Sequence, residues 1–286
     1  MITHNKMIMM PKEKARIYVL LTCFNRKELT LQAVRTLLRG TENAKLTFVV
    51  TDDHSTDGTV EALKELSADI RVIPGSGNLF WNRGMRVSMR YAVKHKKDWD
   101  YVLLINDDVK FFAGVPDMLV SQLRKRDAKV IIGATKDQNG KLSYGGVKKA
   151  SRFFAKFKLM PPREIPSYAD TFNCNCVMLT KEAFLDAGLL DSHYKHSMGD
   201  YDYGLTLRRK GYFLLNAETY VGVCDDNCDE GTWRDPKLPR KKRLKLKEGI
   251  KGLPFKDWFY FVKKNYSIPA AIYHSITPYI KIMIGK

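Results

Sequence analysis

The chain has 286 residues, of which 44% are hydrophobic and 11% aromatic, and this composition excludes a disordered or fibrous protein. The 49 Lys and Arg outnumber the 31 Asp and Glu, and the formal net charge of +18 favours an anionic partner: a nucleic acid, a membrane surface or a phosphorylated substrate. The length allows one large domain with a short extension.

No part of the sequence approaches the roughly 20 apolar residues of a membrane-spanning helix, and residues 1–16 lack the features of a signal peptide. We therefore expect a cytoplasmic protein with reduced thiols and an N-terminal tail over residues 1–14. The pairs Cys174/Cys176 and Cys224/Cys228 together offer four thiols to zinc, although neither has the usual C-x2-C spacing. Zinc binding stays open at this point.

In chain order, short apolar runs alternate with amphipathic stretches. We predict strands at 16–22, 46–51, 70–73 and 101–105, and helices at 29–38, 59–66 and 82–95. The basic, aromatic segment 150–167 is expected to form a loop or a hairpin, followed by a strand at 175–180 and helices at 181–187 and 200–210. This alternation predicts an α/β fold with a doubly wound, mostly parallel sheet, whose ligands bind at the carboxyl ends of the strands.

Two acidic clusters lie at such strand ends. Asp52 and Asp53 follow the second strand, where a carboxylate can accept from a base N–H or a ribose hydroxyl, whereas Asp57 suits a helix cap. Asp107 and Asp108 follow the fourth strand and repel each other unless a cation offsets their charge. Mg²⁺ or Mn²⁺ fits such a pair, with an acidic turn that holds no metal as the alternative.

Two further segments are candidates. The glycine-bearing loop 75–78 opens a helix and could hold a phosphate on its amides, and Arg83 adds a positive charge. Asp200 and Asp202 open a later helix, where acids complement the helix dipole or serve as a base.

Five motifs occur in the order found in family 2 glycosyltransferases, and the chain resembles that family over about residues 15–225. They are TCFNR (22–26), VVTDDHSTDGT (49–59), GNLFWNRGMR (77–86), LLINDDV (103–109) and GDYDYGLTLRRKGY (199–212). Within the family, the chain is most similar to the bacterial branch of rhamnosyltransferase-like enzymes of surface polysaccharide assembly.

The resemblance implies a GT-A fold that binds a nucleotide-diphosphate sugar, and it implies roles for individual residues. Asp108 would be the chief ligand of Mn²⁺ or Mg²⁺, and Asp200 would be the catalytic base. The expected donor-binding residues are Thr22, Asn25 and Arg26 in the nucleotide pocket, Asp53 with Asp52 at the base, Asn78 and Asn82 at the nucleotide and diphosphate, Arg83 at the diphosphate, and Asp107 beside the metal.

Two positions depart from the pattern of the family. Asn106 replaces a frequent first aspartate of the Asp-any-Asp motif. Many relatives place a metal-binding histidine after the base helix, where this chain has Val223-Cys224-Asp225-Asp226, so Cys224 or Asp225 is a candidate third ligand.

The expected function is inverting sugar transfer by a domain at 15–232 to a hydroxyl of a glycan or polyprenyl-diphosphate-linked acceptor, in bacterial cell-surface polysaccharide biosynthesis. The extension at 233–286 is basic and aromatic, with eleven Lys and Arg between residues 236 and 264. It either packs back onto the domain or binds an anionic membrane, which would place the protein at the inner face of the cell membrane.

Two other functions are considered. A sugar nucleotidyltransferase would carry a glycine-rich, basic signature after the first strand, which residues 22–26 lack. A basic nucleic-acid-binding protein would explain the charge but not the ordered acids, so no nucleic acid is expected as a partner.

Overall fold

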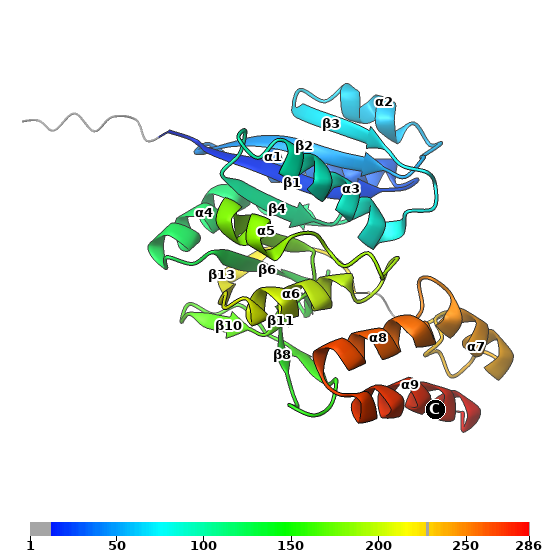
Figure 1. Cartoon of the computed structure of the whole chain (residues 1–286). Coiled ribbons are helices and arrows are strands. Elements are labelled where there is room, and N and C mark those ends of the chain that lie inside the picture. The colour runs from blue at the N-terminus through cyan, green and yellow to red at the C-terminus, as the bar shows by residue number, and fades with distance from the viewer. Residues whose placement is uncertain (1–12, 227–228, 286) are drawn as a thin grey trace, which may run out of the picture.

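The computed structural model describes residues 13–226 and 229–285 and contains a ten-stranded mixed sheet whose main order is β10-β13-β6-β12-β4-β1-β2-β3 (Figure 1). Strands β1 (Ala15–Cys23), β2 (Ala44–Asp52), β3 (Asp69–Pro74) and β4 (Tyr101–Ile105) are parallel. Strand β12 (Cys176–Thr180) runs antiparallel between β4 and β6 (Val130–Lys136). Strand β13 (Leu214–Val223) is parallel to β6, and β10 (Ser167–Ala169) is antiparallel to β13.

Helices cover both faces of the sheet because buried strands alternate their side chains between two cores. On β1, Val19 and Leu21 point into the core under α1 (Lys27–Leu38), α2 (Thr59–Lys64) and α4 (Val115–Lys125). Tyr18 and Leu20 point into the core under α3 (Phe80–Lys94), α5 (Lys181–Ala187) and α6 (Gly199–Arg209). The predicted doubly wound α/β fold is confirmed, and each predicted element lies within about three residues of an observed one.

The segment after β7 (Leu142–Tyr144) builds a second, small sheet in the order β11-β8-β9. Strands β8 (Gly146–Lys149) and β9 (Phe157–Leu159) form an antiparallel hairpin, and β11 (Thr171–Phe172) pairs with β8. The hairpin was one of the two forms expected for 150–167. Strand β5 (Lys110–Phe111) pairs with β13 at the edge of the main sheet.

The predicted extension forms three helices, α7 (Arg240–Glu248), α8 (Phe255–Asn265) and α9 (Ile268–Met283). Helix α8 lies beside α6, and α9 packs against α8 and α7 (Figure 1). Trp258 and Phe261 of α8 share a third core with Leu205 of α6 and Ala271 of α9. Part of the aromatic segment therefore packs back onto the domain, as one of the two alternatives expected. Among the residues that the structure describes, no helix combines the length and hydrophobicity needed to cross a bilayer.

Candidate functional site

The two predicted acidic clusters lie at one edge of the sheet. Asp52 is the last residue of β2, and Asp107 and Asp108 follow the end of β4, which lies on the other side of β1. Because β12 is antiparallel, its beginning lies at this same edge, and the backbone amide of Asn106 donates to the carbonyl oxygen of Asn175 across a distance of 3.4 Å. The loop after β1, the loop after β4 and the segment before β12 therefore surround one site.

The guanidinium of Arg26 forms ion pairs with both carboxylates at the end of β4. Its Nη1 lies 2.8 Å from Oδ1 of Asp107, and its Nη2 lies 3.1 Å from Oδ2 of Asp108. Burial raises the pKa of Asp107 to about 7, although the nearby Arg26 lowers it, and Asp108 raises it further. The repulsion expected between these two carboxylates is therefore partly offset by a side chain of the protein itself.

Cys224 lies beside the acid pair, at the position where many relatives have a histidine. Its Sγ is 3.6 Å from Oδ1 of Asp108 and 3.5 Å from the amide nitrogen of the Asn175 side chain. Asp225 is exposed and accepts from the backbone amide of Gln138 at 3.1 Å. Of the two candidate third ligands, the structure brings Cys224 to Asp108.

Asp200 is the second residue of helix α6. It lies at the same edge of the sheet, since its carboxylate accepts from the backbone amide of Cys174, just before β12. The side chain is half-buried, and its Oδ1 accepts from the amide of Tyr201 at 2.8 Å. Burial raises the pKa of Asp200 to about 6, against the opposing effect of these amide donors. A carboxylate with this pKa is ionised at neutral pH and is a stronger base than an ordinary aspartate.

Asp202 points away from this edge, into the contact with the C-terminal helices. Its carboxylate is buried and accepts from Lys264 Nζ at 2.7 Å and from Asn265 Nδ2 at 3.0 Å. Lys264 also lies 2.7 Å from Oδ2 of Asp191, in the segment that leads into α6. Asp202 is therefore committed to packing, and Asp200 is the acid of this helix that remains available as a base.

Three of the predicted donor-binding residues hold loops together in this structure, and their contacts with a donor stay predictions. Asp53 accepts from the backbone amides of Gly77 at 2.7 Å, Leu79 at 2.8 Å and Phe80 at 3.2 Å. Its two oxygens thus shape the 75–79 loop, where a Cβ on Gly75 would approach Asp53 Oδ1 to 2.7 Å.

The other two are Asn82 and Thr22. Asn82 is fully buried and donates to the carbonyl oxygens of Asp191 and Tyr194 at 2.9 and 2.8 Å, so it anchors the segment before α6. Thr22 donates from Oγ1 to the carbonyl of Thr51 at 3.0 Å and packs under Gly84, where a Cβ would approach Oγ1 to 2.2 Å. Sequence spacing placed these residues near the site but could not show which way they point.

Of the other predicted donor-binding residues, Asp52, Asn25 and Asn78 lie at this edge of the sheet, and Arg83 lies elsewhere. Asp52 is buried and accepts from the amide of Ser55 at 2.9 Å, and the exposed Asn25 accepts from the amide of Thr56 at 2.7 Å. Asn78 is exposed in the 75–79 loop. Arg83 instead lines a depression of about 270 Å³ on the outer side of α3, together with Leu79, Arg86, Arg90 and Ser192.

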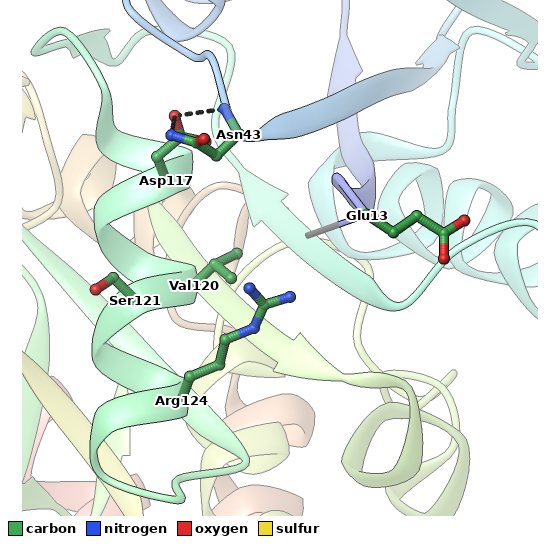
Figure 2. A pocket seen from close by; sticks show the side chains of 6 residues that line it. All are labelled: Glu13, Asn43, Asp117, Val120, Ser121 and Arg124. Atoms are coloured by element: carbon green, nitrogen blue, oxygen red, sulfur yellow. Dashed lines mark hydrogen bonds between the residues drawn. The ribbon is translucent and has the colours of Figure 1, made fainter. Parts of the chain in front are cut away.

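A depression of about 300 Å³ lies at the opposite end of the strands (Figure 2). It is lined by Glu13, which precedes β1, by Asn43, which precedes β2, and by residues of α4 that include Asp117. Asp117 Oδ2 accepts from the amide of Asn43 at 2.9 Å. Because the predicted site residues gather at the other ends of these strands, this depression is not the candidate site.

The acid pair suits a divalent cation, whereas the cysteines do not form a zinc site. Asp107 and Asp108 are oxygen ligands of the kind that Mg²⁺ or Mn²⁺ accepts when water and phosphate oxygens complete the shell. Residues 13–226 and 229–285 contain no group of three or more His, Cys, Asp or Glu placed to hold a metal. Cys174 and Cys176 lie in the cores on opposite faces of the sheet, and Cys228 lies outside the described residues.

Sequence reasoning missed several residues that build the site. Trp81 Nε1 donates to Oδ1 of Asn106 at 2.8 Å and fixes the amide that replaces the frequent first aspartate. Asn175 was assigned only to a strand, Cys174 only to a possible zinc site, and Lys264 only to a basic surface. Asn175 and Cys174 reach the site because β12 runs antiparallel to β4. No local sequence pattern predicts the direction of a strand.

The family described as Glycosyl transferase family 2 matches residues 18–188. The mannosyltransferase PcManGT from Pyrobaculum calidifontis, in complex with GDP-Man and Mn²⁺, aligns with 95% of this chain and 74% of its own at a TM-score of 0.55 and 14% identity. GalNAc-T7 with UDP, GalNAc and Mn²⁺ aligns with 95% of this chain and 56% of its own, at a TM-score of 0.58 and 12% identity. No curated protein matches the sequence. At these identities, the two structures show a shared fold.

Proposed function

The chain belongs to glycosyl transferase family 2 and has the GT-A fold, and on this premise we propose that it transfers a sugar from a nucleotide-diphosphate donor to an acceptor hydroxyl with inversion. The observation that carries the proposal is the position of Asp200. This half-buried carboxylate, whose pKa is raised to about 6 by burial, opens α6 at the edge that holds the acid pair. Asp202, the other acid at the start of α6, is occupied by Lys264.

In the proposed reaction, Asp200 accepts the proton of the acceptor hydroxyl while that oxygen forms a bond to the anomeric carbon of the donor. The bond from this carbon to the diphosphate oxygen breaks on the opposite face, and the nucleotide diphosphate leaves with the electron pair. One displacement of this kind inverts the anomeric centre. The proton of the hydroxyl ends on the Asp200 carboxylate, which then returns it to solvent.

Asp108, with Asp107 beside it, would hold a Mn²⁺ or Mg²⁺ ion, with water and phosphate oxygens as the other ligands. The candidate third ligand Cys224 contacts Asp108 through its Sγ. Such an ion supplies positive charge that stabilises the leaving diphosphate. Both aligned structures were determined with Mn²⁺, which supports a divalent ion without deciding between the two metals. Arg26, which bridges the two carboxylates, holds the pair together when no cation is bound.

The proposal also covers the acceptor of the sugar and the place in the cell where the enzyme works. The acceptor is a glycan or polyprenyl-diphosphate-linked sugar of bacterial cell-surface polysaccharide biosynthesis, in agreement with the rhamnosyltransferase-like motifs. The enzyme works in the cytoplasm, bound peripherally to the inner face of the cell membrane. The excess of Lys and Arg in the C-terminal extension supports an anionic surface as its partner.

The test is a panel of uridine-, thymidine- and guanosine-diphosphate sugars, with Mn²⁺ or Mg²⁺, read by thermal shift and by donor hydrolysis. Asp200→Asn keeps the shape of the side chain and removes its basicity, so we expect donor binding to persist and turnover to fall by roughly 100-fold or more. Glu164→Gln, at an exposed position in the loop before β10, is the matched control. Turnover of Asp200→Asn at the wild-type rate, or product with retained anomeric configuration, would overturn the mechanism.

A further inference from the structure

Helix α9 is rich in apolar residues, and one side of it is covered by the rest of the protein. Its inner face packs on α8 through Ala270 and Ala271, and the Trp258 indole donates to the carbonyl of His274 at 2.9 Å. Its outer face consists of side chains that are 46–59% exposed: Ile268, Ile272, Tyr273, Ile276, Ile280 and Met283, continued by Ile284 just after the helix. The exposed Lys281 is the one charged residue of the helix. An exposed apolar face of this extent marks an interaction surface, and within residues 13–226 and 229–285 it has no partner.

A second segment extends this apolar face. Phe153 and Phe154 lie at the tip of the β8–β9 hairpin, and Phe153 is 77% exposed. The ring of Phe154 lies 5.5 Å from that of Tyr273, and the amide of Ala155 donates to Nε2 of His274 at 3.0 Å. Two segments more than a hundred residues apart in the sequence thus form one apolar surface, which we call the α9–hairpin patch.

The segment that carries α9 is basic, although Arg243 and Lys247 are buried and Lys264 is paired with Asp191 and Asp202. Residues 233–286 contain 14 Lys and Arg but three Asp and Glu. Those three acids have partners within the protein: Glu248 pairs with the buried Lys247, Asp257 lies 3.6 Å from His193 Nε2, and Asp235 accepts from two backbone amides. Arg152 and Lys156 flank the hairpin tip and are exposed. An apolar face within a basic segment is complementary to an anionic lipid surface, whereas two copies of this segment would repel each other.

We propose that the α9–hairpin patch inserts into the headgroup and upper acyl region of a bilayer that contains anionic phospholipid. Tyr273 and the two phenylalanines would lie at headgroup depth, with the isoleucines of α9 below them, and the surrounding lysines and arginines would contact lipid phosphates. Each lysine or arginine near such a surface contributes about 1 kcal/mol of attraction. The helix would lie in the interface because its 16 residues are too few to cross a bilayer, and none of the described helices can span one.

The patch is linked to the helix of the candidate base through the hairpin and through α8, on which α9 packs. Docking would therefore orient the site, and this part of the inference rests on the proposed function. Phe157 of the hairpin packs edge-on against Tyr201, the neighbour of Asp200, with ring centroids 4.9 Å apart. On α8, Lys264 binds Asp202 at the start of α6. A membrane held by α9 and the hairpin would therefore lie on the side of the site where Asp200 meets a lipid-linked acceptor.

The experiment is sedimentation of the full chain with vesicles of phosphatidylcholine, alone or mixed with phosphatidylglycerol. We expect binding to the mixed vesicles that weakens as the salt concentration is raised. The double variant Ile276→Ser/Ile280→Ser should lower the partition coefficient by roughly 10-fold or more, because each isoleucine buries apolar surface in the bilayer. Phe153→Ser/Phe154→Ser should lower it as well. Ile165→Ser, at a similarly exposed apolar position outside the patch, should leave it unchanged.

Three results would overturn the proposal. These are a wild type that does not bind mixed vesicles, patch variants that bind as well as the wild type, and a patch that joins two copies of the chain in analytical ultracentrifugation without vesicle binding. Donor hydrolysis in vesicle-free buffer is measured on the same samples. Hydrolysis that persists while vesicle binding is absent rejects the membrane surface alone, whereas loss of hydrolysis with normal binding rejects the proposed function alone.

Discussion

Lys264 joins the C-terminal helices to the helix that carries the candidate base, and its replacement tests whether this contact holds α6 in place. Its ammonium lies 2.7 Å from both Asp191 Oδ2 and Asp202 Oδ2, and it is 30% exposed, whereas the Asp202 side chain is 2% exposed. We predict that Lys264→Met destabilises the protein because Asp202 would remain buried with Asn265 as its remaining side-chain donor.

The size of the effect follows from the burial of the two partners. Removing one partner of a fully buried ion pair costs about 3–5 kcal/mol, and exposed pairs contribute about 0–1 kcal/mol. Because solvent reaches Lys264 and not Asp202, we expect the free energy of unfolding to fall by about 2–3 kcal/mol. For a domain of this size, that corresponds to a decrease in Tm of several degrees in differential scanning calorimetry.

Lys263→Met is the matched control, since Lys263 is the exposed neighbour and forms no ion pair within residues 13–226 and 229–285. Asp202→Asn added to Lys264→Met should recover part of the lost stability, because it removes the uncompensated buried charge. Equal Tm values for the two lysine variants would refute the reasoning.

The same contact predicts a dependence of stability on pH. Burial raises the pKa of Asp191, but hydrogen bonds from Lys264, the His193 amide and Tyr260 outweigh it and hold that pKa at about 2. A lowered folded-state pKa contributes stability that is present above about pH 4 and is lost as the pH falls through about 2. The difference in stability between wild type and Lys264→Met should therefore narrow at acid pH, and a constant difference would show that Asp191 is not part of the contact.

Three further predictions concern the site. Because burial raises the pKa of Asp200 to about 6 and the base acts when ionised, kcat should rise with pH through about 6, and Asp200→Asn should lose this rise; a profile that is unchanged in the variant would assign the titration elsewhere. Asp108→Ala should abolish the metal-dependent part of nucleoside-diphosphate binding in calorimetry, and metal-dependent affinity that persists would contradict its role as chief ligand. Asp53→Ala should speed hydrogen exchange at the amides of Gly77, Leu79 and Phe80, whose shared acceptor is lost, and unaltered exchange would show that the loop does not depend on this carboxylate.

Local sequence patterns were sufficient for the elements that were predicted, although α4, β6, β13 and the three C-terminal helices were not among them. Strand 101–105 and helix 181–187 were predicted with their observed limits. A short apolar run and an amphipathic stretch can each be recognised from neighbouring residues alone. The acidic clusters were also correctly placed at strand ends, since parallel strands bring their carboxyl ends to one edge of a sheet. Asp57, interpreted as a cap, accepts from the amides of Lys27 and Thr59.

The orientation of side chains at that edge was decided by contacts between segments distant in the sequence. Asp52 and Asp53 are adjacent and have the same local signal, yet Asp53 serves the 75–79 loop because that loop folds back over the end of β2. Asp200 and Asp202 open the same helix, but two residues along a helix face different directions, and α8 packs against one of them. Neither contact can be predicted from the periodicity of the sequence, because each joins segments that are far apart in the chain.

By itself, the sequence determined the alternation of strands and helices, the family and the residues available for chemistry, because these follow from the order and type of neighbouring residues. The tertiary structure alone decided that β12 runs antiparallel and brings Cys174 and Asn175 to the site, and that Arg26 bridges Asp107 and Asp108. It also decided that the hairpin tip joins α9 in one apolar surface. Each of these outcomes depends on strand direction or on packing between segments far apart in the chain, and the free energy of such contacts is not encoded in any short stretch of residues.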